Sequence, residues 1–253
     1  MHHVTKTVLS LLFLAPLTAW SQGESQEANT MDKGWMVNTY LNAEAPMGAW
    51  ADRYTSHLGT GLNFQWQFAS GWVIGAEATY LFGGSLAQGD SLIAHLLTQE
   101  GEILANDGSY ASLQSELRGG RYGLQFHRVL PLPVDGASWV IGAGAGYTHH
   151  KVWLIADGVP QLHEPYIYGL DQLHDGFYIT PQLTYRYLDP YKVRNYSLIL
   201  ELGIAQTQSV RGFNYCTRLP DTDRKWDFWL GFRATWILPQ MTCTGEQKIK
   251  YYH

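Results

Sequence analysis

Apolar and polar side chains alternate along the stretch NYSLILELGIAQTQ, from Asn195 to Gln208. One parity holds large apolar residues from Tyr196 to Ile204, and the other holds small residues and Glu201. Successive side chains of a strand point to opposite faces. The stretch therefore predicts a strand with one apolar face and one face that is small and carries a charge.

The same alternation recurs along the chain and predicts eight strands. Each is about as long as the 9 to 11 residues that a tilted membrane-spanning strand needs, with a short overhang. The predicted strands are 34–43, 57–68, 72–83, 115–128, 138–149, 176–188, 195–206 and 226–238.

The connections between the predicted strands alternate in length. Residues 69–71, 129–137 and 189–194 form short connections, and longer ones separate them. Short turns at one end and long loops at the other are typical of bacterial outer-membrane barrels, in which the short turns are periplasmic. The predicted fold is all-β: an eight-stranded antiparallel up-and-down transmembrane β-barrel of the outer-membrane type, with both termini in the periplasm.

In such a barrel the apolar parity faces lipid. Aromatic residues gather at both ends of the outward face, as in the aromatic girdles of outer-membrane barrels. On the short-turn side these are Trp35, Trp66, Phe68, Trp72, Trp139, Tyr185, Tyr187, Tyr196 and Trp236. A soluble eight-stranded barrel or sandwich would bury the same face as its core, and it is the structural alternative.

Composition favours the membrane interpretation. Of 253 residues, 45% are hydrophobic and 15% charged, below the roughly 25% charged residues of soluble domains. Sixteen Tyr and ten Trp suit the edges of a bilayer. After the N-terminus there is no apolar stretch of the roughly 18 residues that a spanning helix needs, so a membrane-spanning chain would have to be a closed barrel.

The N-terminus predicts export. Lys6 precedes a short apolar run, and Ala19 and Ser21 provide the small residues of a signal-peptidase site. We expect a signal peptide at 1–21, a periplasmic segment at 22–33, the barrel at 34–238 and a periplasmic tail at 239–253. Cleavage would change the net charge from −5 to −6. This mild acidity argues against nucleic acid as a partner.

Charged residues also fall on the inward parity, and we single out five of them. Glu77, Arg121, Glu201 and Arg233 lie at similar heights, and Arg186 lies nearer the periplasmic mouth. An eight-stranded barrel is wide enough only for its own side chains, and buried charges must be paired. We predict an interior network of ion pairs that closes the barrel, with a gated or proton-conducting lumen as the alternative.

Arg118 has the outward parity. It falls near the edge of the outer leaflet, where a charge costs roughly 0 to 1 kcal/mol. We expect Arg118 to contact lipid headgroups, which makes outer-membrane lipid and lipopolysaccharide expected partners.

The long loops contain residues that could carry chemistry. His and Asp residues gather around 149–175, but no pair has HxxxH spacing, so exposed polar residues are the simpler interpretation. ANDGS, at 105–109, lacks the alternating acids of a calcium loop and predicts a turn. No His-x-Ser element of a lipid A deacylase occurs. The sequence therefore indicates no catalytic residue, metal or cofactor.

One loop has an apolar face. Leu92, Ile93, Leu96 and Leu97 recur at helical spacing within 91–104. Apolar surface outside the membrane needs a cover. The segment is therefore a candidate partner-binding loop, and the alternative is that it caps its own barrel.

Four segments carry a resemblance to a known family. They are ATYLFGGS (78–85), ILANDGSYASLQ (103–114), RGGRYGLQF (118–126) and FWLGFRATWILP (228–239). The chain resembles a family of small outer-membrane barrels of Bacteroidota. That resemblance implies a non-enzymatic barrel subunit of an envelope complex, such as the accessory barrel of the outer-membrane protein insertase or of the type IX secretion apparatus. A lipid-modifying enzyme and a stand-alone adhesin or OmpA-like barrel are the rivals from other classes.

The two cysteines test this topology. Cys216 falls in the last long loop and Cys243 follows the last predicted strand, so the predicted topology puts them on opposite sides of the membrane. A disulfide needs Cα atoms within about 7 Å of each other. We therefore expect no disulfide between them within one chain.

Overall fold

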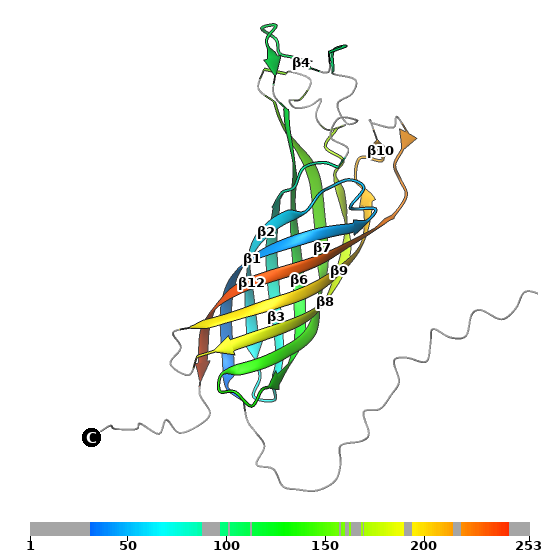
Figure 1. The fold of residues 1–253 in the computed structure, drawn as a ribbon. Helices are drawn as coiled ribbons and strands as arrows, with labels where there is room; N and C mark the ends of the chain where they lie inside the picture. The colour runs from blue at the N-terminus through cyan, green and yellow to red at the C-terminus, as the bar shows by residue number, and fades with distance from the viewer. Residues whose placement is uncertain are drawn as a thin grey trace, which may run out of the picture. The chain divides into compact units, whose positions relative to one another are not determined.

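The computed structural model describes residues 31–87, 97–100, 102–111, 113–156, 158–159, 162, 168, 170–189, 194–214 and 219–242. Eight long strands form one closed antiparallel barrel in the order β1-β12-β9-β8-β7-β6-β3-β2 (Figure 1). These strands are β1 (Lys33–Gly48), β2 (His57–Gln67), β3 (Trp72–Gly83), β6 (Leu113–Pro131), β7 (Ala137–Ala156), β8 (His174–Leu188), β9 (Asn195–Ser209) and β12 (Lys225–Thr242). The predicted eight-stranded barrel is confirmed.

The described parts of the long connections contain two short hairpins, β4 (Ile103–Leu104) with β5 (Tyr110–Ala111) and β10 (Phe213–Asn214) with β11 (Leu219–Pro220). Figure 1 shows both at one end of the barrel, which we call the long-loop end. The other end carries the short connections 68–71, 132–136 and 189–194, and we call it the short-turn end. The described residues include no helix long and apolar enough to cross a membrane.

Several strands run further toward the long-loop end than the sequence predicted. β6 and β7 stay paired up to Leu113 and Ala156, so all of 150–156 is strand and not the loop that the sequence pattern predicts. The alternation continues there, since Val152 and Leu154 are buried on the inward parity. β1 likewise continues through Pro46, where it pairs with β12 alone and proline is tolerated as on any edge strand.

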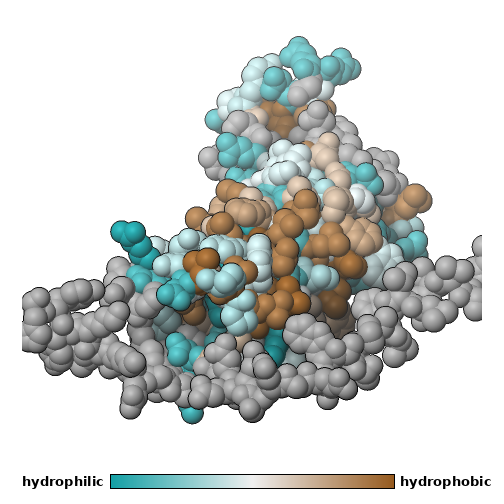
Figure 2. All heavy atoms as spheres, turned by 60° about the horizontal axis from the view of Figure 1, so that its bottom comes forward, coloured by the Kyte–Doolittle hydropathy of each residue, from teal (hydrophilic) through white to brown (hydrophobic). Residues whose placement is uncertain are grey.

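The outer wall is apolar. Leu124 and Phe177 on the predicted outward parity are 71% and 75% exposed. Apolar side chains cover much of the wall in Figure 2. Outward aromatic residues pair across neighbouring strands near the short-turn end, as Trp72 with Phe126 and Trp139 with Tyr185 do. A second set lies nearer the long-loop end, where Tyr147 pairs with Phe177 across β7 and β8 and Tyr80 stacks on Phe82 of the same strand. These are the two girdles of a membrane barrel.

The barrel interior is filled in layers. A small apolar cluster closes the short-turn end, consisting of Met36, Val73, Val129, Val140 and Ile237. Inward-facing amides follow, with the buried Asn63 and the half-buried Gln65 both donating to Gln125. A charged layer comes next, and a second apolar cluster that includes Trp50, Tyr54 and Trp229 lies on its long-loop side.

Glycines make room for the interior aromatic rings. A Cβ added to Gly203 would lie 1.8 Å from the Trp229 ring, and one added to Gly61 would lie 2.4 Å from the Tyr40 hydroxyl. Each ring therefore lies across a glycine on a neighbouring strand. This packing fills a narrow barrel with large side chains without widening it.

Candidate functional site: the barrel interior and its mouths

Two arginines and three carboxylates meet in the middle of the barrel. Arg233 on β12 lies 2.8 Å from Glu77 on β3 and 2.8 Å from Glu201 on β9. Arg121 on β6 lies 3.8 Å from Glu201 and also donates to Glu44 on β1. All five side chains are at most 3% exposed. The structure thus brings together four of the five interior residues that the sequence singled out.

Aromatic rings cover the two guanidinium groups. The Arg121 guanidinium lies 4.4 Å from the centre of the Trp229 ring, and that of Arg233 lies 4.2 Å from the centre of the Tyr40 ring. The Tyr178 hydroxyl donates to Glu77 at 3.1 Å. A ring face attracts a desolvated cation, so the aromatic residues help to hold the charges as well as filling space.

Glu44 was missed by the sequence analysis. One oxygen of its carboxylate accepts a hydrogen bond from Arg121, and the other oxygen lies 3.1 Å from Nε2 of His57. The predicted strand ended at 43, yet Glu44 continues the inward parity of β1 after Tyr40 and Asn42. The inward parity of position 44 was therefore the sequence signal that could have identified Glu44 as an interior residue.

Arg186 does not join the interior network, contrary to our prediction. It is buried near the short-turn end, where its Nε donates to the Ser138 hydroxyl at 3.3 Å. Among the described residues, no carboxylate lies within 4 Å of its guanidinium group. Arg186 lies at a different level along the barrel axis from the charged layer. It pairs in register with Ser138 and Ser197 near the short-turn end, whereas the residue of β8 that pairs with Glu201 is Gln182.

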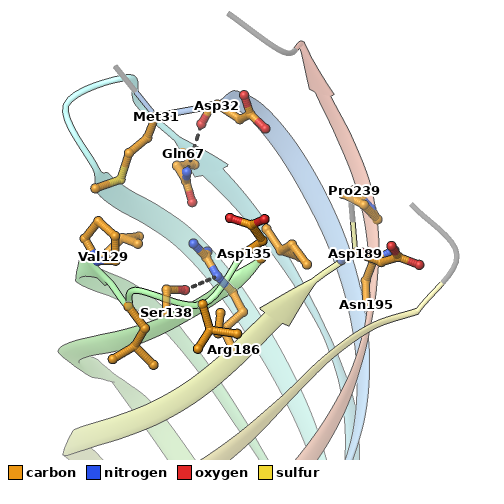
Figure 3. Close-up of a pocket in the computed structure, with 16 residues that line it drawn as sticks. Met31, Asp32, Gln67, Val129, Asp135, Ser138, Arg186, Asp189, Asn195 and Pro239 are labelled. Carbon is orange, nitrogen blue, oxygen red and sulfur yellow. Dashed lines mark hydrogen bonds between the residues drawn. The ribbon is translucent and has the colours of Figure 1, made fainter. Parts of the chain in front are cut away.

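Arg186 lines a cavity of about 430 Å³ at the short-turn mouth. Figure 3 shows its side chain beside Ser138, with Asp32 and Gln67 on the other side of the opening. Gln67 donates to the backbone oxygen of Asp32 at 2.8 Å. The cavity also has apolar walls, among them Met31 and Val129, so it combines one buried cation with apolar surface.

The long-loop end of the interior is closed by the connection between β1 and β2. Trp50 and Tyr54 turn inward from this connection and are 2% and 1% exposed. Burial raises the pKa of the Tyr54 phenol well above its usual value, so the group is neutral at physiological pH. Arg53, from the same connection, lies 2.5 Å from Asp227 on β12. Arg53 lies between the predicted strands 34–43 and 57–68, so strand parity gives no signal for this ion pair.

Arg118 lies on the outer wall, as its parity predicted. Its guanidinium pairs with Glu116 at 2.6 Å and donates to the Tyr80 hydroxyl at 3.4 Å. The side chain lies near the long-loop girdle. Contact with lipid stays a prediction.

Part of the candidate partner-binding loop, 91–96 and 101, lies outside the described residues. Leu92, Ile93 and Leu96 belong to that part, and both cysteines also lie outside the described residues. Leu97 is described: it forms a β-bridge with Ile103 and packs, half buried, against the second apolar cluster, the one that includes Trp50 and Trp229. At this position the structure matches the alternative in which the segment covers its own barrel.

The interior chemistry is that of a filled, charge-paired core. Among the described residues, no three His, Cys, Asp or Glu side chains are grouped as a metal site requires.

ANDGS, between β4 and β5, forms the predicted turn, in which Asp107 accepts hydrogen bonds from the Ser109 amide and hydroxyl at 2.9 and 2.6 Å.

An apolar wall between two aromatic girdles, a polar filled interior and short turns at one end define the class of protein. The chain is an eight-stranded β-barrel of the outer-membrane type. No protein-family model and no curated protein sequence matches it.

Two solved structures of small barrels are similar to the described chain. Neisserial surface protein A has 10% identity and a TM-score of 0.40, covering 80% of this chain and 97% of that one. The attachment invasion locus protein Ail of Yersinia pestis, in complex with the heparin analogue sucrose octasulfate, has 10% identity and a TM-score of 0.37. It covers 81% of this chain and 100% of that one.

Proposed function

We propose that the chain is a non-enzymatic outer-membrane barrel that serves as a structural or partner-binding subunit of an envelope complex. One observation carries this proposal: the interior is filled by paired charges and buried aromatic rings. A barrel filled in this way offers no passage for a solute. We therefore place its binding surfaces on the outer wall and at the two mouths of the barrel.

The proposed orientation places the short turns and both termini in the periplasm. It follows from the difference in connection length, since outer-membrane barrels have short periplasmic turns and longer extracellular loops. In this orientation the cavity beside Arg186 opens to the periplasm. The hairpins β4–β5 and β10–β11 lie outside the cell.

Assembly of outer-membrane proteins is the process we propose for the complex. The support comes from the sequence: the four segments quoted above resemble small barrels of Bacteroidota, a resemblance that implies an accessory subunit of the insertase. An accessory barrel of type IX secretion is the alternative that the same segments support. A stand-alone adhesin or a lipid-modifying enzyme would belong to different classes.

Purification of the tagged full chain in mild detergent, followed by mass spectrometry, tests the proposal. We expect stoichiometric recovery of a defined set of outer-membrane proteins or lipoproteins that includes the insertase. Recovery of secretion components instead would support the alternative. A barrel recovered alone, from cells whose lipid A structure changes when its gene is deleted, would contradict both and indicate an enzyme.

A further inference from the structure

A groove of about 500 Å³ lies on the outer wall of the barrel near the long-loop end. It runs over β3, β6 and β7. Six side chains line it, namely Tyr80, Arg118, Tyr122, His149, Lys151 and Trp153. The groove is thus cationic in the middle and aromatic at its edges.

Two cations face each other across this groove. Arg118 on β6 and Lys151 on β7 are direct partners in the antiparallel register. Like charges directly opposite each other on neighbouring strands are destabilising. Within the described ranges, Arg118 has one carboxylate partner, Glu116. Among the described residues, no carboxylate lies within 4 Å of the Lys151 ammonium group, whose nitrogen lies 5.1 Å from the centre of the Trp153 ring. The wall therefore carries a positive charge that an anion would stabilise.

A glycine shapes the floor of the groove. Gly120 pairs in register with His149, whose ring stacks on Tyr122 with centroids 5.9 Å apart and an interplanar angle of 18°. A Cβ at Gly120 would lie 2.8 Å from Cε1 of His149 and 3.3 Å from the Tyr122 hydroxyl. The absence of a side chain at Gly120 lets the imidazole lie against the wall beside the two cations.

The height of the groove indicates what kind of anion fits. Tyr80 and Tyr122 belong to the long-loop girdle, and aromatic girdles mark the level of lipid headgroups. Toward the middle of the wall, the outward positions are apolar, as at Leu124 and Ala145. An anion held between Arg118 and Lys151 would thus lie at headgroup level, with apolar protein surface beneath it for acyl chains.

We propose that this groove binds the phosphate group of a lipid headgroup, with Arg118 and Lys151 sharing the phosphate oxygens. Guanidinium and ammonium groups form charge-assisted hydrogen bonds with phosphate. The aromatic side chains Tyr80 and Trp153 pack beside the headgroup. This inference rests on the proposed orientation, in which the leaflet is the outer one and the ligand is a phosphorylated glycolipid.

Binding of purified full chain to lipid A in detergent micelles tests this site. The variant R118Q/K151Q should bind bis-phosphorylated lipid A about tenfold or more weakly than the native chain, since each charge-assisted bond contributes to affinity. Dephosphorylated lipid A should bind the native chain as weakly as phosphorylated lipid A binds the variant. Inorganic phosphate at the same concentration should not compete, because it lacks the acyl chains.

Arg128→Gln is the matched control. Arg128 is another outward arginine of β6, at the opposite end, where its guanidinium lies 5.0 Å from the centre of the Trp72 ring. This variant should bind lipid A like the native chain. If the double variant fails to fold, as judged by heat-modifiability, the single variant K151Q replaces it in the binding measurement, since no described ion pair depends on Lys151.

Three outcomes would overturn the site: equal binding of native chain and folded variant, equal binding of dephosphorylated lipid A, or competition by inorganic phosphate, which would make it a free-anion site. The measurement needs no partner protein. A chain that binds lipid A through this groove but is always recovered alone would contradict the proposed function and leave the lipid site intact.

Discussion

At the scale of single residues, the charged layer contains three carboxylates and two guanidinium groups from the described part of the chain. Arg233 bridges Glu77 and Glu201, and Arg121 bridges Glu44 and Glu201. Glu201 is therefore shared by both arginines, while each arginine also has a carboxylate of its own. The four residues that the sequence places at this height are two acids and two arginines, and Glu44 is a third acid, which changes which substitutions should be costly.

Replacement of Arg233 by Met should destabilise the barrel strongly. It leaves Glu77 and Glu201 without their nearest cation, and removal of one partner from a buried pair costs about 3 to 5 kcal/mol. Glu201→Gln keeps the shape and leaves each arginine with one carboxylate, so it should cost clearly less. Unfolding by urea in lipid vesicles measures both. Equal losses in the two variants would contradict the bridging role of Arg233.

At the scale of elements, the fit between strands depends on glycines beneath aromatic rings. Gly203 on β9 and Trp229 on β12 are register partners, and the indole lies across the glycine. The Trp229 ring in turn contacts Trp50, at 5.3 Å between centroids, and the Arg121 guanidinium. A side chain at position 203 would therefore disturb the charged layer and the second apolar cluster together.

Gly203→Val should lower the temperature at which the folded barrel converts to the unfolded form on gels. The added side chain overlaps the indole, and overpacking of this kind typically costs about 1 to 3 kcal/mol. Ala145→Val is the control, because Ala145 is exposed on the outer wall of β7. It should have little effect. A Gly203→Val barrel as heat-stable as the control would show that the Trp229 ring can move away from position 203 without loss of stability.

The connection between β3 and β6 gives a second prediction at this scale. Changing Leu92, Ile93 and Leu96 to Ser should leave the barrel folded, since loops outside the membrane contribute little to the strand ladder, but should reduce recovery of the proposed complex. Leu104→Ser, an exposed position of β4 in the same connection, is the control. Unchanged recovery of the complex would mean that these residues cover only their own barrel.

At the scale of the whole molecule, the topology separates the two ends of β12 across the membrane. The residues just before Cys216 form β10 at the long-loop end, and those just before Cys243 end β12 at the short-turn end. The lipid-embedded band of such a barrel is about 25 Å tall. Both cysteines lie outside the described residues, so their fate is a prediction from this topology.

A membrane-impermeant maleimide should label Cys216 on intact cells and label Cys243 only after the outer membrane is permeabilised. Substitution of each cysteine by serine identifies which of the two reacts. A protein partner that covers the loop would slow labelling of Cys216 without exposing Cys243. Labelling of Cys243 alone on intact cells would reverse the proposed orientation, and a disulfide between the two within one chain would overturn the topology.

The sequence by itself determined the strand count, the lipid-facing parity and the inward position of Glu77, Arg121, Glu201 and Arg233. Lipid allows only an apolar outer face and a closed ladder, so a period of two is enough to assign both faces. The same period of two in the sequence also placed Arg118 on the outer wall.

Only the tertiary structure decided which charges meet. Glu77 and Arg233 lie on strands far apart in the chain, and Arg186 has the same inward parity without reaching any described carboxylate. Arg53 comes from a loop that folds back to Asp227, and Lys151 faces Arg118 through a register set beyond the predicted strand ends. Periodicity fixes a face, but contacts across the lumen depend on the stagger and tilt of all eight strands, which no single segment encodes.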